Sequence, residues 1–357
     1  MNIFKNDFEQ RWEELFRDVK KLNEYTATRP VELRKVKVSG HDIDGSIFIG
    51  AKFINVEFES TRGQKSKFLK TLFKDCTFVS SNFDESIFAD VEFANCKFLD
   101  STLSGSTMTN VRFVNCTMEE TKLTGLDGTE LVIEGGEYGT RTSFSFSGLP
   151  LKLKDAIFSG VNFMGMVDSC PLTIEGGLLS EVDFSKSHFS TVTLRRVRQG
   201  EGGIKFNNIT AENIRLEKVE LDGIGFMGSY AKTAIIVDSV VLAIGFSGGG
   251  VGEIIFRDST VQYFDIAESM MPHVEFNSCR LIEPMLYDGF IKEFAIRDSS
   301  VKDITGNGFK ADIVVWDNVT LDGKIDLTNA QIKDFRPTRI KRGPRLQLIT
   351  TGSNIRF

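Results

Sequence analysis

A large apolar residue recurs every five residues over most of the segment from Phe48 to Leu123. An α-helix repeats every 3.6 residues and a β-strand every two, so a period of five matches neither element. The period therefore belongs to a larger unit that the chain repeats. We call these positions centres: Phe48, Phe53, Phe58, Phe68, Phe73, Phe78, Phe83, Phe88, Phe93, Phe98, Leu103, Met108, Phe113, Met118 and Leu123, with Gly63 as the only break in the series.

A small or short-branched residue stands two positions before each centre, as Ser86 does before Phe88 and Cys96 before Phe98. A narrow tube needs such pairs, because a large and a small inward side chain together fill the interior without voids or clashes. The pattern predicts that both positions point inward.

A second period of twenty residues lies above the first. Cys76, Cys96 and Cys116 are twenty residues apart, and so are Phe78 and Phe98. Four five-residue segments therefore make one coil. If each coil lies on the one before, equivalent residues stack at the spacing of parallel strands, about 4.8 Å. We call a set of residues at this spacing a column.

The second half of the chain keeps the period of twenty and loses the period of five. Short motifs such as VDSVV, RDSTV and RDSSV recur at the corners, where Asp and Ser hold a tight bend by bonding to their own backbone. Two columns show the repeat: Leu216, Ile236, Phe256, Phe276, Ile296 and Trp316, and then Leu221, Val241, Val261, Leu281, Val301 and Leu321.

Composition places few limits on function. The 357 residues carry a formal net charge of −6, too small for a disordered acidic chain and of the wrong sign for a basic nucleic-acid binder. Five cysteines without paired spacing argue against a disulfide framework. No apolar run reaches the length of a membrane-spanning helix, and the start MNIFKNDFEQ lacks the features of a signal peptide. We expect a soluble cytoplasmic protein; an effector exported without a signal would have the same features.

The segment 45–125 resembles the pentapeptide-repeat family, in which a small residue, any residue and then Leu or Phe recur. The sequence reads SNFDE, SIFAD, VEFAN, CKFLD and STLSG in succession. The resemblance implies an all-β fold, a right-handed, four-sided parallel β-helix of about 20 residues per coil. Beyond residue 205 the corners also resemble the β-helices of polysaccharide lyases, whose coils are usually longer than twenty residues.

The chain is expected to divide into three parts. Residues 1–28 form an N-terminal amphipathic helix, residues 31–335 form the β-helix, and residues 336–357 form a basic C-terminal tail after Pro337 ends the coil pattern. The β-helix has regular pentapeptide repeats over 45–125, irregular coils over 126–205 and regular twenty-residue coils over 206–330. In the irregular part, LVIEGGEYG at Leu131 and LTIEGGLLS at Leu172 lie 41 residues apart, which predicts two coils with one extra residue.

The N-terminal helix is expected to cover the open edge of the first coil, since an uncovered edge pairs with other chains. Its apolar face comprises Phe4, Phe8, Trp12, Leu15, Phe16, Val19 and Leu22, and Arg29-Pro30 ends the segment. Binding to a partner or a membrane, or pairing of two copies into a homodimer, are the alternatives for this helix.

The sequence offers no converging set of catalytic groups. His41, His188 and His273 lie many coils apart, and a solenoid converts that separation into distance along its axis. The stacked Cys76, Cys96 and Cys116 occupy small inward positions, where cysteine behaves as a small hydrophobe. The FSGGGVGE segment at Phe246 lacks the Lys-Ser/Thr of a phosphate loop. Asp238, Asp258 and Asp298 repeat every twenty residues at corners, which indicates turns. We therefore expect no enzyme, no catalytic residue, no metal and no cofactor.

Surface charge supplies one candidate function. The segment 75–120 holds many acids and only two bases, Lys97 and Arg112, so rows of acids along the β-helix are expected to create a negative field. Some pentapeptide-repeat relatives imitate the DNA duplex and bind type II topoisomerases, so the resemblance implies DNA gyrase, topoisomerase IV or another DNA-binding protein as an alternative partner. Beyond Asp75, the candidate residues are Asp84, Glu85, Asp90, Glu92, Asp100, Glu119 and Glu120.

The preferred function is a non-enzymatic scaffold that presents loops and charged faces to a protein partner. We expect a binding loop at residues 61–67, TRGQKSK, where Gly63 interrupts the centres and Arg62, Lys65 and Lys67 gather. The basic tail is a second candidate, with Arg336, Arg339, Lys341, Arg342 and Arg345, and it is the only part expected to contact nucleic acid. A carbohydrate-active β-helix protein is the third class.

Overall fold

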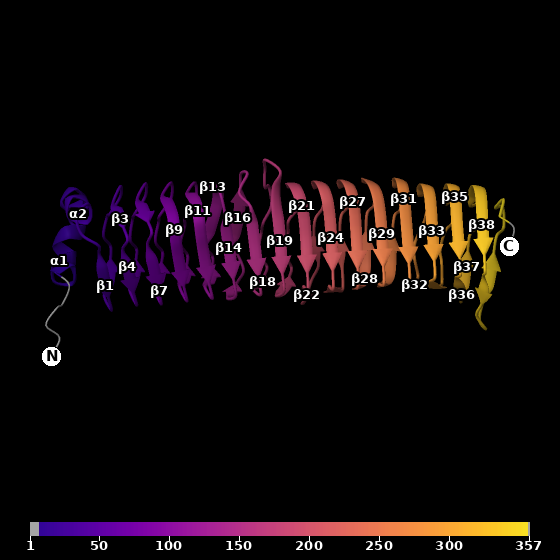
Figure 1. The fold of residues 1–357 in the computed structure, drawn as a ribbon, viewed down its shortest axis with the longest axis horizontal. Helices are drawn as coiled ribbons and strands as arrows, with labels where there is room; N and C mark the ends of the chain where they lie inside the picture. Colours follow the sequence, from indigo (N-terminus) through magenta and orange to yellow (C-terminus); the bar gives the residue numbers. More distant parts are fainter. Residues whose placement is uncertain (1–6, 356–357) are drawn as a thin grey trace. The chain divides into compact units, whose positions relative to one another are not determined.

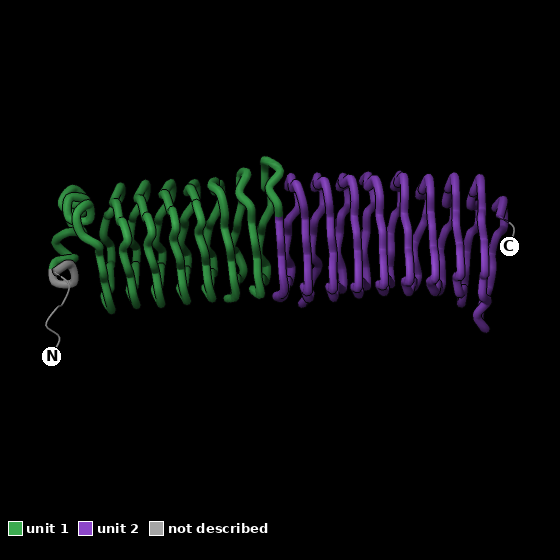
Figure 2. Tube along the Cα trace, viewed as in Figure 1, with its two compact units in different colours: residues 1–171 green, residues 172–357 purple. Residues whose placement is uncertain are grey.

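The computed structural model describes residues 7–355 and divides the chain into two compact units, residues 1–171 and 172–357 (Figure 2). Within each unit, parallel strands of successive coils lie side by side (Figure 1). The chain makes about 16 turns of about 20 residues each, which confirms the parallel β-solenoid that the repeat predicts.

The first unit has short strands on the successive sides of each coil, and we number its sides by them. Side 1 begins with β3 (Ile47–Ile49) and β6 (Lys67–Leu69), and then β9 (Ile87–Ala94) and β11 (Thr107–Val114) run on from side 1 into side 2. Side 2 also holds β1 (Glu32–Arg34), β4 (Lys52–Ile54), β7 (Leu72–Lys74), β14 (Leu131–Glu134) and β17 (Leu151–Lys154). Side 3 holds β2 (Lys37–Ser39), β5 (Glu57–Glu59), β8 (Thr77–Val79), β10 (Lys97–Leu99), β12 (Thr117–Glu119), β15 (Glu137–Tyr138) and β18 (Ile157–Ser159). Side 4 is built mainly from isolated β-bridges between adjacent coils, such as the one from Asp42 to Arg62. In later coils this side contains β13 (Lys122–Gly128) and β16 (Ser143–Phe146). The strand β19 (Cys170–Glu175) spans the point in the sequence where the second unit begins.

The predicted columns exist in the first unit. Phe78 pairs in register with Phe98, and their ring centroids lie 4.6 Å apart with planes 3° from parallel. Phe93 and Phe113 stack in the same way on side 2, at 4.7 Å. These rings are almost fully buried, so the interior is a set of continuous aromatic stacks. Stacked aromatic pairs add about 0.5–1.5 kcal/mol each to the free energy gained by burial.

The corners of the coils require a left-handed backbone. The residue two positions after a centre has a positive φ at most corners, for example 54° at Asp90 and 52° at Asn110. Asp and Asn tolerate this conformation because their short polar side chains bond locally. The side chain of Asn110 donates to the carboxylate of Asp90 at 2.9 Å, so the corner residues of adjacent coils also bond to each other.

One extra residue enters the first unit within the segment that was expected to be irregular. Lys122 of β13 pairs with Ser143 of β16, which makes this coil twenty-one residues long, and the register shifts between Leu123 and Leu126. On side 2 the spacing stays at twenty, because Leu131 pairs with Leu151.

The N-terminal segment contains two helices where the sequence predicts one. Helix α1 (Asp7–Phe16) ends just before Asp18, and the side chain of Asp18 accepts from the Lys21 amide as the N-cap of α2 (Val19–Thr26). An N-cap aspartate favours a new helix start, which explains the break. Phe4, expected on the apolar face, lies outside the described residues, as does the side chain of Phe8.

Both helices pack against the first coil of their unit. The Phe16 ring is buried and meets the edge of Phe48 at a centroid distance of 6.3 Å. Asn23 makes two hydrogen bonds to backbone groups at the open edge of the first coil. Its Nδ2 donates to the Gly45 carbonyl at 3.1 Å, and its Oδ1 accepts from the Ile47 amide at 2.8 Å. No helix within residues 7–355 is long and apolar enough to cross a membrane.

The second unit has longer strands. Its largest sheet consists of β21 (His188–Arg195), β24 (Thr210–Glu217), β27 (Tyr230–Val237), β29 (Gly250–Arg257), β31 (Met270–Asn277), β33 (Phe290–Arg297), β35 (Lys310–Asp317) and β38 (Gln331–Thr338). A second sheet consists of β20 (Leu178–Ser180), β22 (Arg198–Gln199), β25 (Glu220–Leu221), β28 (Val240–Gly245), β30 (Thr260–Asp265), β32 (Arg280–Ile282), β34 (Ser300–Lys302), β36 (Thr320–Asp322) and β39 (Lys341–Arg342). The second sheet also contains β23 (Ile204–Lys205) and β26 (Ile224–Gly225), and β37 (Lys324–Asp326) pairs with β40 (Gln347–Ile349) in a two-stranded sheet.

The C-terminal segment differs from the tail that the sequence analysis expects after Pro337. Trp316 pairs with Pro337 in register, β39 pairs with β36, and β40 pairs with β37, so the coil pattern continues to Ile349. Proline fits there because β38 is the last strand of its sheet in the described chain. Its missing backbone N–H therefore removes no hydrogen bond to a following strand. Asn354 then closes this edge, because its Oδ1 accepts from the Ile332 amide at 2.9 Å and its Nδ2 donates to the Ile332 carbonyl at 2.7 Å.

Candidate protein-binding surface

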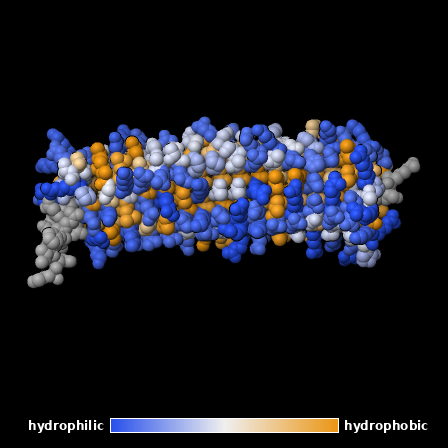
Figure 3. Space-filling view, viewed as in Figure 1, coloured by the Kyte–Doolittle hydropathy of each residue, from blue (hydrophilic) through white to orange (hydrophobic). Residues whose placement is uncertain are grey.

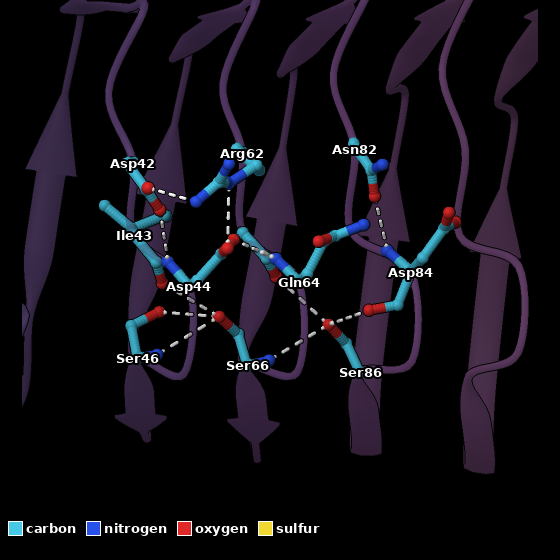
Figure 4. A network of polar contacts seen from close by, with 11 residues as sticks. Asp42, Ile43, Asp44, Ser46, Arg62, Gln64, Ser66, Asn82, Asp84 and Ser86 are labelled. Carbon is cyan, nitrogen blue, oxygen red and sulfur yellow. Dashed lines mark hydrogen bonds and ion pairs between the residues drawn. The ribbon is translucent and has the colours of Figure 1, made fainter.

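Residues 61–67 form part of a regular coil and no protruding loop, contrary to the sequence expectation (Figure 4). Arg62 bridges to Asp42 before it and Asn82 after it, each twenty residues away. Its guanidinium forms an ion pair with Asp42 and a second with Asp44, where Nε lies 2.8 Å from Oδ2. The charge of Arg62 is thereby placed against acids of the preceding coil.

Serines hold the corner beneath Arg62. The hydroxyls of Ser46 and Ser66 lie 2.9 Å apart, and the Ser66 amide donates to the hydroxyl of Ser86 at 3.1 Å (Figure 4). All three serines are fully buried, so each coil is bonded to the next along the inside of this corner. The break at Gly63 therefore leaves the coil intact.

Lys65 and Lys67 point outward at this corner. Lys65 lies 3.6 Å from Glu85 of the next coil, and both side chains are exposed. Lys67, the first residue of β6, is exposed and forms no ion pair with a described residue. The binding role predicted for these residues remains a prediction.

The acids of residues 75–120 surround the first unit and form no row. Only Asp100 and Glu120 share a column, one coil apart. Asp75, Asp90 and Glu85 occupy three other corners, and Asp84 and Glu92 belong to sides 4 and 2. The rows expected from the sequence are absent because the acids recur at irregular spacings and the coil has a strict period of twenty.

Most of these acids also have local partners. Asp75 accepts from Asn95 at 3.0 Å, Asp100 from Ser80 at 3.1 Å, and Asp84 from the Ser104 amide at 2.7 Å. Glu120 pairs with Arg141 at 2.7 Å, and Glu92 lies 4.0 Å from Arg112. Glu119 forms no ion pair with a described residue. The carboxylates thus stabilise the stacking of coils, and the field they create is spread over the whole circumference.

Two of the five basic residues near the C-terminus pair with acids of the preceding coil. Arg339 donates to Asp317 at 2.8 Å and Arg345 to Asp322 at 2.9 Å. These arginines hold the pKa of each aspartate below its ordinary value of 3.8. Arg336 pairs with Asp334 in the same strand. Lys341 and Arg342 form β39 and have no ion pair with a described residue.

The stacked cysteines are buried, as the sequence analysis expects, and none of the three is joined in a disulfide. The Cys76 thiol donates to the Phe53 carbonyl at 3.2 Å, and the Cys116 thiol donates to the Phe93 carbonyl at 3.2 Å. Burial, with the neighbouring thiols, raises the pKa of Cys96. Within residues 7–355 no group of three or more His, Cys, Asp or Glu residues is arranged to hold a metal ion.

The corner aspartates of the second unit lie beside a shallow, solvent-open depression of about 570 Å³. Asp258 and Asp298 line it together with Arg280 and Lys341. Both aspartates have a left-handed backbone, with φ 50° and 48°, and Asp298 accepts from Asn318 at 2.7 Å. These carboxylates therefore hold the corners, as their period of twenty predicts.

The FSGGGVGE segment forms a turn that leads into β29, so no helix follows it to receive a phosphate. Gly248 has φ 68°, and a Cβ on Gly249 would lie 2.3 Å from the Ser229 carbonyl oxygen. The glycines are thus required by the turn and by the close approach of the preceding coil.

Four exposed apolar side chains of the second unit gather at one corner, where the turns enter the largest sheet. Tyr230 and Met270 are the first residues of β27 and β31, and they are 59% and 71% exposed. Met227 and Tyr287 lie in the turns before β27 and β33 and are 53% and 41% exposed. We call these four residues the corner patch.

Glycine leaves the corner patch open at its centre. Gly250 lies between Tyr230 and Met270 in the same column, and a Cβ on Gly250 would be 3.2 Å from Cδ1 of Tyr230. The Tyr230 ring therefore rests against the Gly250 backbone. With no side chain at this position, nothing in the intervening coil covers the facing sides of Tyr230 and Met270.

Two acids border the corner patch. Glu268 and Asp288 are exposed corner residues with φ 56° and 47°, and neither forms an ion pair with a described residue. An apolar surface next to unpaired carboxylates favours a partner that has apolar groups and a positive charge.

The sequence analysis overlooked the corner patch. The signal was present: Tyr230 stands between the inward Ser229 and Ala231 columns, so alternation places it outside. Large apolar residues at outward positions of a repeat with a well-filled interior are unusual and indicate a contact surface.

The strand register places the chain in the class of parallel β-solenoids with coils of about 20 residues. Residues 66–139 match the family model described as the pentapeptide repeat region. This segment therefore carries the pentapeptide repeat that the sequence resemblance implies. No curated protein matches the chain.

Three solved structures are similar to the chain at low identity. HetL, a pentapeptide repeat protein involved in heterocyst differentiation regulation from the cyanobacterium Nostoc sp. strain PCC 7120, is 12% identical, with 67% of this chain and 92% of HetL covered and a TM-score of 0.30. Trypsin-treated QnrB1, a plasmid-mediated fluoroquinolone resistance protein, is 16% identical, with 50% and 83% covered and a TM-score of 0.27. A PL6 alginate lyase in complex with a trisaccharide is 10% identical, with 89% and 85% covered and a TM-score of 0.21. These scores carry no argument about function.

Proposed function

We propose that the protein is a non-enzymatic interaction scaffold that binds a protein partner through the corner patch of its second unit. The observation that carries the proposal is the exposure of Met227, Tyr230, Met270 and Tyr287 at a single corner. Tyrosine and methionine are favoured at protein contacts because they bury much apolar surface and adapt their shape at low entropic cost.

The chemistry of the partner follows from the border of the patch. Glu268 and Asp288 are exposed and unpaired with any described residue. The partner segment therefore presents an apolar side chain that rests between Tyr230 and Met270, with lysine or arginine beside it. Phe290, the half-buried first residue of β33, extends the apolar surface by one coil.

The first test is capture of a partner from a lysate of the source organism, followed by measurement of binding with the purified partner. Tyr230→Ala combined with Met270→Ala should weaken binding by about 2 kcal/mol or more, which is the size of a binding hot spot. The matched control is Val240→Ala combined with Leu242→Ala, because these residues are 44% and 38% exposed on a different sheet of the same unit.

The two variants decide the proposal together. Unchanged binding in the Tyr230 and Met270 variant, with circular dichroism showing a folded protein, contradicts it. Equal losses in both variants also contradict it, because the contact would then not be local to the corner patch.

A type II topoisomerase is included as a defined test partner, because the family resemblance implies DNA gyrase or topoisomerase IV. A supercoiling assay with increasing protein measures inhibition or protection directly. If the dispersed acids of residues 75–120 carried the contact, the effect would fade with added salt, since exposed charges are screened over about 10 Å at 0.1 M salt. An effect that depends on Tyr230 and Met270 instead places the contact at the corner patch.

A further inference from the structure

Side 1 of the first unit is the least charged sheet face of that unit. Over β3, β6, β9 and β11 its only charged outward residue is a lysine, and the following coil adds the exposed Asp127 of β13, in register with Thr107. We call this surface the side 1 face: Ile47, Ile49, Lys67, Leu69, Ile87, Ala89, Thr107 and Thr109. Ile49 is 46% exposed and Ile87 is 37% exposed, so the apolar groups face solvent. The surface seen in Figure 3 is mostly hydrophilic, with apolar residues among the polar ones.

Charges stand at both borders of the side 1 face, in the same order along the axis. One border has Lys65 followed by Glu85 in the next coil, and the other has Lys70 followed by Asp90. All four residues are exposed corner residues with a left-handed backbone. The coils on either side of these two have Gly45 and Gly105 on the first border and Gly50 and Asn110 on the second, so they add no charge.

This order makes the face complementary to itself. We infer that two copies of the chain associate through their side 1 faces, with one solenoid turned end over end relative to the other. The two-fold axis then runs between the coil of Lys65 and the coil of Glu85. Each lysine meets an acid of the other copy: Lys65 faces Glu85, and Lys70 faces Asp90, twice each by symmetry.

The apolar residues match in the same arrangement. Leu69 of one copy faces Ala89 of the other, and Ile49 faces Thr109, so a large side chain meets a smaller one at each position. Lys67 faces Ile87, and a lysine can lay its apolar stem on an isoleucine while its ammonium reaches solvent or a border carboxylate.

The charges also exclude the other symmetric arrangement. With both solenoids pointing the same way, Lys65 would face Lys70 and Glu85 would face Asp90. Like charges placed opposite each other suppress association, so the borders select the antiparallel dimer.

The dimer is expected to be weak. The face is about four coils deep, or about 14 Å between its outer strands at a spacing of about 4.8 Å. Stable interfaces bury about 800 Å² per partner, which is more than a face of this size supplies. Association is therefore expected only at high micromolar protein concentration, as in many transient contacts.

The experiment uses sedimentation equilibrium of the full chain with charge-reversed borders. Lys65→Glu with Lys70→Asp gives an all-acidic border, and Glu85→Lys with Asp90→Lys gives an all-basic border. Each variant alone should dimerise at least about tenfold more weakly than the unmodified chain. An equimolar mixture of the two should recover association, because opposite borders then meet in every pair.

The matched control is Lys52→Glu with Lys74→Glu, which makes the same change of charge on side 2, in β4 and β7. It should leave dimerisation unchanged. Raising the salt from about 0.1 M to about 1 M should weaken the unmodified dimer, since the screening length falls from about 10 Å to about 3 Å.

Three results would overturn the inference. The first is an unmodified chain that stays monomeric at several hundred micromolar, and the second is a dimer that both border variants leave intact. The third is a mixture that associates no better than its components while circular dichroism shows all variants folded. None of these results bears on the corner patch, because the test of the corner patch changes residues of the second unit only.

Discussion

The ring of Phe83 occupies the space that a side chain on Gly63 would need. A Cβ built on Gly63 would lie 2.5 Å from Cε1 of Phe83. Phe83 is buried and packs edge to face with Phe58, Phe68 and Phe78, at centroid distances of 6.1, 5.9 and 5.7 Å. The break in the five-residue series is therefore a packing adjustment: Gly63 has no side chain, and the Phe83 ring of the next coil fills the space that a large residue would otherwise occupy.

Gly63→Ala should accordingly destabilise the first unit by about 1–3 kcal/mol, the range for overpacking a filled core, as measured by urea unfolding. The control is Gly245→Ala, because a Cβ at Gly245 meets no atom within 4 Å and its φ is not in the left-handed region. Adding Phe83→Leu to Gly63→Ala should cost less than the two single changes together, because the shorter side chain makes room. Equal stability of the Gly63 and Gly245 variants would show that the ring moves aside freely.

Asn23 should be necessary for a closed first coil. Replacing it with alanine leaves the Ile47 amide and the Gly45 carbonyl without their partners in α2. We expect a loss of about 1–2 kcal/mol, together with aggregation at high concentration because the exposed strand edge can pair with other chains. Hydrogen exchange at the Ile47 amide measures the local effect.

Glu24→Ala is the control for this change, because Glu24 is exposed on the same helix and forms no ion pair with a described residue. The proposed role of Asn23 would be refuted if the two variants exchanged the Ile47 amide at the same rate.

The period of twenty was sufficient to predict the interior of the solenoid. Phe78 and Phe98 stack because a strict repeat leaves no other position for them, and the paired small residues, such as Cys76 and Cys96, lie in the neighbouring column. The same rule placed Asp258 and Asp298 at corners. Columns are local consequences of the repeat, so they can be read from the sequence without coordinates.

Contacts at the ends of the repeat could not be predicted in this way. Arg345 meets Asp322 twenty-three residues earlier, because the last coil contains an insertion that shifts the register. The break between α1 and α2 depends on the capping by Asp18, which competes with the continuous apolar face. The expected loop at residues 61–67 failed for a third reason, since the missing centre is filled from the next coil and the chain does not bulge.

The last coil should loosen at low pH. The pKa values of Asp317 and Asp322 are lowered by Arg339 and Arg345, so both carboxylates have lower pKa values in the folded chain than in the unfolded chain. A lowered folded pKa contributes stability above the ordinary value of 3.8, and this contribution is lost as the pH falls below it. The protection factors of the β39 and β40 amides, which are exchange rates corrected for the intrinsic rate at each pH, should therefore fall as the pH is reduced from about 5 to about 3, around the ordinary aspartate pKa.

Asp317→Asn combined with Asp322→Asn should already show fast exchange of β39 and β40 at neutral pH and should remove most of the acid dependence. Persistence of the full acid dependence in this double variant would assign it to other carboxylates. Because the Arg339–Asp317 and Arg345–Asp322 ion pairs are exposed, high salt should screen them and loosen the last coil in part, even at neutral pH.

Lys218 should be a point at which the second unit can be stabilised. It is an exposed corner residue with φ 54°, in the column where Asp238, Asp258 and Asn318 adopt the same conformation. A left-handed backbone costs most residues about 1–2 kcal/mol, and after glycine the penalty is lowest for asparagine. Lys218→Asn should therefore raise the free energy of unfolding by about 0.5–1 kcal/mol.

Lys310→Asn is the control, because this exposed lysine begins β35 without a positive φ, and asparagine is disfavoured in strands. If both variants changed stability in the same direction, removal of a lysine charge would be the cause and the corner conformation would not.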